Sequence, residues 1–366
     1  IVPDEARTFG MEGMFRQVGI YTAEGQKYVP NDRNQIMYYR EDKTGQVLEE
    51  GINEAGAMSA WIAAATSYST NNYPLIPFYI YYSMFGFQRV GDLAWAAGDM
   101  RARGFLLGGT AGRTTLNGEG LQHQDGHSHI LSATIPNCVS YDPVFAYEVA
   151  VIIREGMRRM YEANESVFFY LTLLNENYQH PAIPADVEEG IIKGMYLFQE
   201  GAEGGRARVQ LLGSGAIFRE VLAAAAMLKN DFNIDADVWS VTSFTELARE
   251  GHHIQRWNTL HPEAPRRQTF LTRQLQNREG PLLAATDYMR MFAEQIRPFI
   301  DGRGMQALGT DGFGRSDTRE QLRHHFEVDR YYVVLGALEL LANDGLVDRD
   351  LISEVIARYN IDVNKT

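Results

Sequence analysis

The chain has 366 residues, of which 45% are hydrophobic and 22% are charged. This balance is typical of folded globular domains and excludes disorder as the main state. At ~100–200 residues per domain, the length predicts two domains. The 34 basic and 47 acidic side chains give a formal net charge of −13, which argues against a nucleic-acid binder that works by neutralising phosphates.

The one cysteine, Cys138, excludes an intrachain disulfide, so we expect a reducing compartment, the cytoplasm. We interpret this cysteine as a buried apolar residue. No apolar run approaches the ~20 residues that a membrane helix needs. The first residues show neither a signal peptide nor an initiator methionine, and we therefore expect a chain that is processed or cut from a longer one.

Helix and strand patterns alternate along the first half of the chain. Asn53 is a typical N-cap for a helix over 54–65, and the aromatic stretch 75–82 predicts a buried strand. The polar, turn-rich stretch from Glu24 to Thr44 is expected to form a long surface loop. The other expected elements are strands over 46–51, 104–109 and 166–174 and helices over 92–103 and from Asp142 onward.

The composition changes at residues 199–208, which are rich in glycine and charge and are expected to form a linker. Strands that alternate with helices favour right-handed crossovers and parallel sheets. We therefore predict two doubly wound α/β domains, residues 1–198 and 209–366. In the second domain, strands are expected over 209–215, 236–242, 282–285 and 305–308, and helices over 216–228, 288–299, 317–326 and 331–342.

Glu54 is expected at the junction between the strand 46–51 and the helix that follows. In open α/β sheets, ligands bind at the carboxyl ends of strands. A carboxylate there can accept a hydrogen bond from a heterocycle, and apolar surroundings would raise its pKa. The alternative is an acidic residue that only offsets the helix dipole, worth ~0.3–1 kcal/mol.

The segment from Tyr79 to Arg89 contains five aromatic residues and ends in an arginine. Such a cluster can build a stacking wall for a flat ring, because aromatic stacking adds ~0.5–1.5 kcal/mol beyond burial. The alternative is ordinary core packing, since strands favour aromatic residues.

Three histidines and an aspartate lie close together between His123 and His129. These residue types can bind zinc, but the flanking glycines place them on a loop rather than along one helix face. The ring of His123 can instead act as a general acid near neutral pH. A solvated loop is the third interpretation, and the pattern alone leaves all three open.

The glycine-rich stretch from Gly309 to Asp317 matches neither the dinucleotide fingerprint nor the P-loop. We interpret it as a tight turn between a strand and a helix. The shorter motif at 213–215 predicts no cofactor either.

Five ordered strings together resemble the bacterial homodimeric pyruvate dehydrogenase decarboxylating component, a family that uses thiamine diphosphate. The resemblance runs almost from end to end and implies a pyrimidine-binding domain followed by a transketolase C-terminal-like domain. It implies oxidative decarboxylation of pyruvate with transfer of the acetyl group to a lipoyl group. The strings that carry it are 1–11, 50–56, 81–89, 118–129 and 308–320.

The resemblance also assigns residues to the coenzyme. Glu54 matches the glutamate that hydrogen-bonds the pyrimidine ring nitrogen, and positioned proton transfer of this type is worth ~10²–10⁴ in rate. Phe85 matches the residue that stacks on the aminopyrimidine. Ile52 and Tyr82 are expected to line the same pocket.

Three further residues match polar groups near the reacting carbon, and all three are expected to be catalytic. They are Glu5, Arg89 and His123, of which His123 is expected to serve the transfer to the lipoyl group. The loop from Glu24 to Thr44 corresponds to an active-site loop of the family.

The family implies a homodimer, with the coenzyme between subunits, that works on the dihydrolipoyl acetyltransferase core of a complex. Its Mg²⁺ and diphosphate are held by a first domain through a Gly-Asp-Gly signature, which this sequence does not contain. We therefore expect no metal ligands here and an inactive isolated fragment. The alternatives are another transketolase-like thiamine enzyme, acting on another 2-oxo acid or a sugar phosphate, and a non-catalytic dimerisation or docking module.

Overall fold

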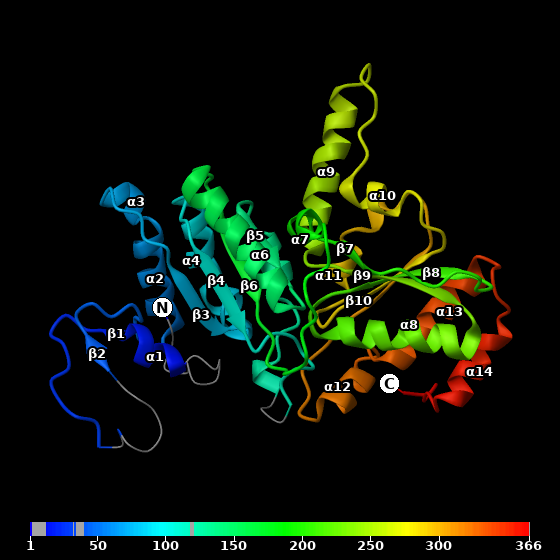
Figure 1. The fold of residues 1–366 in the computed structure, drawn as a ribbon, viewed down its shortest axis with the longest axis horizontal. Coiled ribbons are helices and arrows are strands. Elements are labelled where there is room, and N and C mark those ends of the chain that lie inside the picture. The colour runs from blue at the N-terminus through cyan, green and yellow to red at the C-terminus, as the bar shows by residue number, and fades with distance from the viewer. Residues whose placement is uncertain (2–11, 32, 34–39, 118–120, 366) are drawn as a thin grey trace.

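The computed structural model describes residues 1, 12–31, 33, 40–117 and 121–365. Figure 1 shows two α/β lobes side by side, each built around its own sheet, with the helix α9 (Phe244–Leu260) projecting from the second lobe. This arrangement confirms the predicted α/β class. Among the described residues, no helix combines the length and the apolar character that a membrane crossing requires.

The first sheet has four parallel strands in the order β3-β4-β6-β5. Three of them were expected close to their observed positions. The fourth, β5, begins at Cys138, which is fully buried as expected. The bounds are Phe78–Tyr82 for β3, Phe105–Gly109 for β4, Cys138–Tyr141 for β5 and Phe168–Thr172 for β6.

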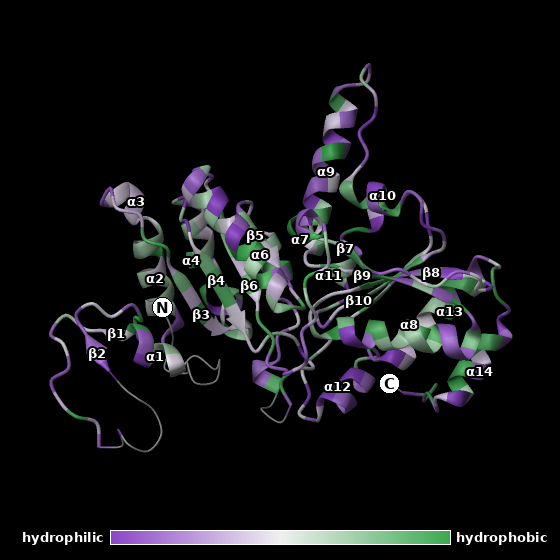
Figure 2. Ribbon diagram, in the orientation of Figure 1, coloured by the Kyte–Doolittle hydropathy of each residue, from purple (hydrophilic) through white to green (hydrophobic). Residues whose placement is uncertain are grey.

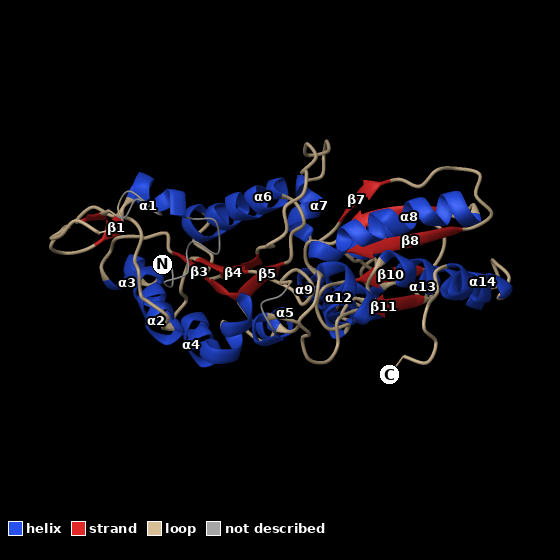
Figure 3. Ribbon diagram, turned by 90° about the horizontal axis from the view of Figure 1, so that it is seen from below, coloured by secondary structure: helices blue, strands red, loops and turns tan. Residues whose placement is uncertain are grey.

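Helices cover both faces of this sheet (Figure 3). Alternation along β3 explains why: Tyr79 packs with α2 and α4 on one face, and Ile80 packs with α6 and α7 on the other. Trp61 of α2 is fully buried, and its Nε1 donates to the Phe105 carbonyl over 3.2 Å. The bounds are Glu54–Ala65 for α2, Phe87–Asp99 for α4, Ala146–Met157 for α6 and Glu188–Lys193 for α7.

The second sheet has the order β11-β10-β8-β9-β7, and only β7 runs antiparallel to its neighbour. Strand β7 ends at Gln199, the first residue of the expected linker, yet pairs with β9, so the exact division at residue 198 stays a proposal. The bounds are Tyr196–Gln199 for β7, Arg208–Gly213 for β8, Asp235–Ser240 for β9, Leu282–Ala285 for β10 and Met305–Leu308 for β11.

The second sheet is also covered on both faces, by two separate groups of helices. Figure 2 shows the projecting end of α9 as mostly hydrophilic. One face carries α8 (Phe218–Phe232), α13 (Arg330–Asn343) and α14 (Asp350–Arg358), and the other carries α9, α10 (Phe270–Leu275) and α11 (Met291–Glu294).

Several expected elements differ from the structure. The strand predicted over 46–51 is wrong: this stretch has isolated bridge positions at Val47, which pairs with Ile20, and at Glu49. The helix predicted over 288–299 is divided into α11 and a 3₁₀ turn at Arg297–Phe299. The helix α12 spans Arg319–His325, within the predicted range 317–326, whereas α9 and α10 were not predicted. Residues 32 and 34–39 of the expected loop 24–44 lie outside the described residues, and short strands β1 (Ile20–Tyr21) and β2 (Glu41–Asp42) lie at its ends.

The two sheets meet at the carboxyl ends of their strands. Asp142, directly after β5, accepts hydrogen bonds from Thr172 Oγ1 at 2.7 Å and from Ser214 Oγ, directly after β8, at 2.8 Å. Asp287, two residues past β10, accepts from the backbone N–H of Thr114 at 3.2 Å. We call these five residues the interlobe seam. Strand β3, at the opposite edge of the first sheet from β5, takes no part in the interlobe seam.

Candidate active site

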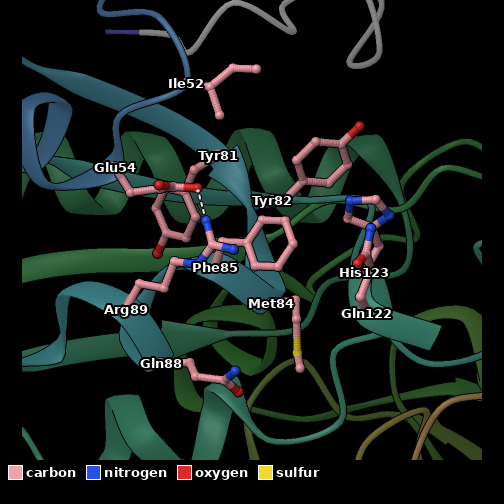
Figure 4. A pocket seen from close by; sticks show the side chains of 10 residues that line it. All are labelled: Ile52, Glu54, Tyr81, Tyr82, Met84, Phe85, Gln88, Arg89, Gln122 and His123. Carbon is pink, nitrogen blue, oxygen red and sulfur yellow. Dashed lines mark hydrogen bonds and ion pairs between the residues drawn. The ribbon is translucent and has the colours of Figure 1, made fainter. Parts of the chain in front are cut away.

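A cavity of about 390 Å³ lies at the carboxyl end of β3, the edge strand farthest from the seam. Ligand sites of open α/β sheets are found at this kind of edge. Figure 4 shows the side chains that line it, which come from the start of α2, from the end of β3 and the turn after it, and from the histidine loop. They are Ile52, Glu54, Tyr81, Tyr82, Met84, Phe85, Gln88, Arg89, Gln122 and His123.

Glu54 is the first residue of α2. The Asn53 side chain caps that helix by accepting the Gly56 N–H over 3.0 Å, as predicted. The Glu54 side chain is only 17% exposed, and its Oε1 accepts a hydrogen bond from Arg89 Nη1 over 2.8 Å. Its expected position after a strand over 46–51 is wrong, because the strand end beside it belongs to β3.

Three rings form one wall of the cavity. The Tyr82 and His123 rings stack with centroids 4.9 Å apart, and the Phe85 ring meets both edge-on at 6.0 and 5.2 Å. Arg89 places its guanidinium carbon 3.9 Å from the Phe85 centroid. Within the aromatic segment, Tyr79 is buried in the core, whereas Tyr81, Tyr82 and Phe85 line the cavity.

The three histidines of the predicted cluster have different surroundings. His123 lines the cavity, and His127 Nε2 lies 2.6 Å from Gln88 Oε1. His129 is fully buried, its Nε2 lies 3.1 Å from Thr172 Oγ1, and burial lowers its pKa to about 3. No group of three or more His, Cys, Asp or Glu side chains that could hold a metal ion occurs in the described part of the chain.

All the predicted site residues that the structure describes line this one cavity. Glu5 lies outside the described residues. Sequence reasoning did not single out Tyr81, Met84, Gln88 and Gln122, although they lie in the strings 81–89 and 118–129. Their closeness in the sequence to the predicted residues was the signal that could have identified them. The roles of the predicted site residues stay predictions.

Comparison with known proteins identifies the family. Residues 1–181 match the model described as "Pyruvate dehydrogenase E1 component middle domain", and residues 194–329 match "Transketolase-like TK C-terminal domain". All 366 residues align at 65% identity with the pyruvate dehydrogenase E1 component of Cupriavidus necator and at 61% with that of Escherichia coli K12. The chain belongs to the pyruvate dehydrogenase E1 component family. It spans 41% of the length of these E1 relatives.

Solved structures support the fold alone. The transketolase of Leishmania mexicana has a TM-score of 0.66 at 14% identity, over 93% of this chain and 42% of its own length. A chain titled "Split gene transketolase, inactive beta4 tetramer" has a TM-score of 0.58 at 15% identity, over 92% of this chain and 97% of its own length. The two-lobed architecture of this E1 family member is thus also found in a separate chain of similar extent.

Proposed function

We propose that this chain supplies the pyrimidine-binding part of a thiamine-diphosphate enzyme that decarboxylates pyruvate oxidatively and transfers the acetyl group to a lipoyl group. Membership of the E1 family supports this activity. The observation that carries the proposal is the cavity at the end of β3, which brings a carboxylate, Glu54, and an aromatic face, Phe85, to one place.

The residues of the cavity fit the pyrimidine end of the coenzyme. Glu54 is a poorly exposed carboxylate that can hydrogen-bond a ring nitrogen and share its proton. Phe85 offers a ring face for stacking, and Ile52 and Tyr82 add apolar surface on two sides. When bound, thiamine diphosphate supplies the electron sink that stabilises the carbanion left as CO₂ departs.

The remaining roles follow from the cavity and the family resemblance. We assign His123 to proton transfer during acetylation of the lipoyl group, because its ring lines the cavity beside Phe85. Arg89 and Glu5 are proposed to act near the reacting carbon. Exclusion of water by the aromatic wall would protect the carbanion from protonation.

The partners are also proposals. We infer a cytoplasmic homodimer that delivers acetyl groups to the dihydrolipoyl acetyltransferase core. The Mg²⁺ and diphosphate ligands are assigned to residues that this chain does not contain. This assignment is consistent with the 41% of the relatives' length that the chain spans.

The test compares substrates with the full-length protein that contains this chain. Turnover with pyruvate, but not with 2-oxoglutarate or xylulose 5-phosphate, is expected; preference for either of the others would favour the alternative thiamine enzymes. Calorimetric titration of residues 1–366 with thiamine diphosphate and Mg²⁺ is expected to show no tight binding. Tight binding by the isolated chain would contradict the division of the coenzyme site.

A further inference from the structure

Arg89 makes the two contacts that the proposed function gives to the pyrimidine ring. Its Nη1 donates to Glu54 Oε1 over 2.8 Å, and its guanidinium carbon lies 3.9 Å from the centre of the Phe85 ring. Figure 4 shows the guanidinium between the carboxylate and that ring. A guanidinium is planar and rich in N–H donors, so it satisfies a carboxylate and a ring face much as an aminopyrimidine does.

One carboxylate oxygen and one ring face cannot serve both groups in this way at once. We propose that Arg89 is an internal competitor for the pyrimidine site, which the coenzyme displaces when it binds. The inference rests on the proposed function, because it concerns the same Glu54 and Phe85.

The structure makes Arg89 the movable partner of the three. Its side chain is 49% exposed, whereas that of Glu54 is 17% exposed and stands on a capped helix end. Phe85 is held edge-on against Tyr82 and His123. The helical geometry of α4 is interrupted directly after Arg89, at Val90 (φ −125°, ψ 27°). Arg89 therefore stands on a short first turn and can move away from Glu54 and the Phe85 face without disturbing the core.

Competition and charge attraction predict opposite changes in coenzyme affinity when the Arg89 cation is removed. Removing a cation from the site should weaken binding of an anionic diphosphate if long-range attraction dominates. Removing a competitor should instead strengthen binding. The contacts that must be broken are an exposed ion pair and a cation–π contact, so their loss from the free protein is expected to tighten coenzyme binding about three- to thirtyfold.

The experiment measures the affinity of thiamine diphosphate, with Mg²⁺ and without pyruvate, for the full-length coenzyme-free protein. Arg89→Gln is expected to bind the coenzyme three- to thirtyfold more tightly than wild type. Arg89→Lys is expected to have an intermediate affinity, because lysine keeps the positive charge but lacks the planar guanidinium group. The ratio of the Arg89→Gln and wild-type affinities should shrink as ionic strength rises, since salt screens the exposed ion pair.

Two further variants separate the possible failures. Arg154→Gln, which removes an arginine–glutamate ion pair with Glu188 far from the cavity, should leave the affinity unchanged. If Glu54→Gln weakens binding but Arg89→Gln binds no more tightly than wild type, the competition is rejected and the proposed function stands. If Glu54→Gln has no effect on binding, both are rejected.

Discussion

The two edge strands of the first sheet end in contrasting surroundings. Strand β3 ends at an open cavity, where Glu54 is paired with an exposed arginine. Strand β5 ends against the second sheet, where Asp142 is fully buried and is satisfied by hydroxyl groups from both lobes. The comparison explains the position of the candidate site: parallel sheets bind ligands at their carboxyl edge, and in the first sheet the seam lies at the ends of β5 and β6, away from β3.

The seam is also the more tightly constrained of the two places. Gly215 has φ +48°, and its backbone N–H donates to the Asp142 carbonyl over 3.3 Å. A Cβ at that position would lie 2.5 Å from Asp142 Oδ2, so only glycine fits. At the cavity, by contrast, the Arg89 side chain is 49% exposed and is held by one ion pair and one ring contact. Substitutions at the cavity should therefore change chemistry, and those at the seam should change stability.

Replacing Glu54 by alanine is expected to give the largest effect on activity. Loss of the carboxylate should lower pyruvate turnover of the full-length protein by ~10²–10⁴, the range for positioned proton transfer. The fold should persist, which circular dichroism can check. Glu54→Gln, which keeps the shape and removes the charge, should lose most of the same activity. Unchanged turnover in either variant would reject the assigned role.

His123→Ala is expected to separate two steps of the reaction. Acetylation of a lipoyl group should fall at least tenfold more than decarboxylation measured with an artificial oxidant, within the ~10²–10⁴ range of acid–base catalysis. His127→Ala is the matched control, because its ring contacts Gln88 rather than the aromatic wall. Equal losses in both assays for His123→Ala would argue against a role in transfer.

The sequence predicted the candidate site better than it predicted the path of the chain. Local signals located Asn53 as a cap and the β3, β4 and β6 strands, because aromatic and apolar runs and helix caps depend on residues that are neighbours in the sequence. The prediction of a strand over 46–51 was wrong because a strand needs successive pairings, and among the described residues this stretch has isolated bridge positions at Val47, which pairs with Ile20, and at Glu49. The pairing of Asp142 with Ser214 joins residues 72 positions apart, and no local pattern reports it.

Asp142→Ala is expected to be the most destabilising substitution at the seam. It removes the nearest acceptor of the Thr172 and Ser214 hydroxyls inside the protein and leaves them the longer contacts to the Tyr141 carbonyl and Thr286 Oγ1. Each buried polar group left without its partner costs ~1–3 kcal/mol, so we expect a loss of about 2–4 kcal/mol in the free energy of unfolding. Chemical denaturation can measure it against Glu339→Ala, an exposed helix position expected within ±0.5 kcal/mol. A loss as small as the control's would show that the seam does not depend on this carboxyl.

The seam should also make stability depend on pH. Burial raises the pKa of Asp142 and of Asp287 from 3.8 to about 7. Between pH 4 and 7 the folded state therefore binds more protons than the unfolded state, and its stability should fall as the pH rises, by up to ~1.4 kcal/mol per pH unit for each group. Asp142→Asn should make this slope shallower by about one proton. A slope identical to that of wild type would exclude Asp142 as its source.

The smallest expected effect tests whether the cavity depends on the helix that carries Glu54. Asn53→Ala removes the acceptor of the Gly56 N–H and should cost ~1 kcal/mol of stability, the usual value of an N-cap. Thr269→Ala removes the equivalent cap of α10 and should cost a similar amount. Only Asn53→Ala should also weaken thiamine diphosphate binding in the full-length protein, because a frayed first turn releases Glu54 from its place opposite Phe85. Equal binding by both variants would mean that the core contacts of Trp61 and its neighbours hold α2 in position without the cap.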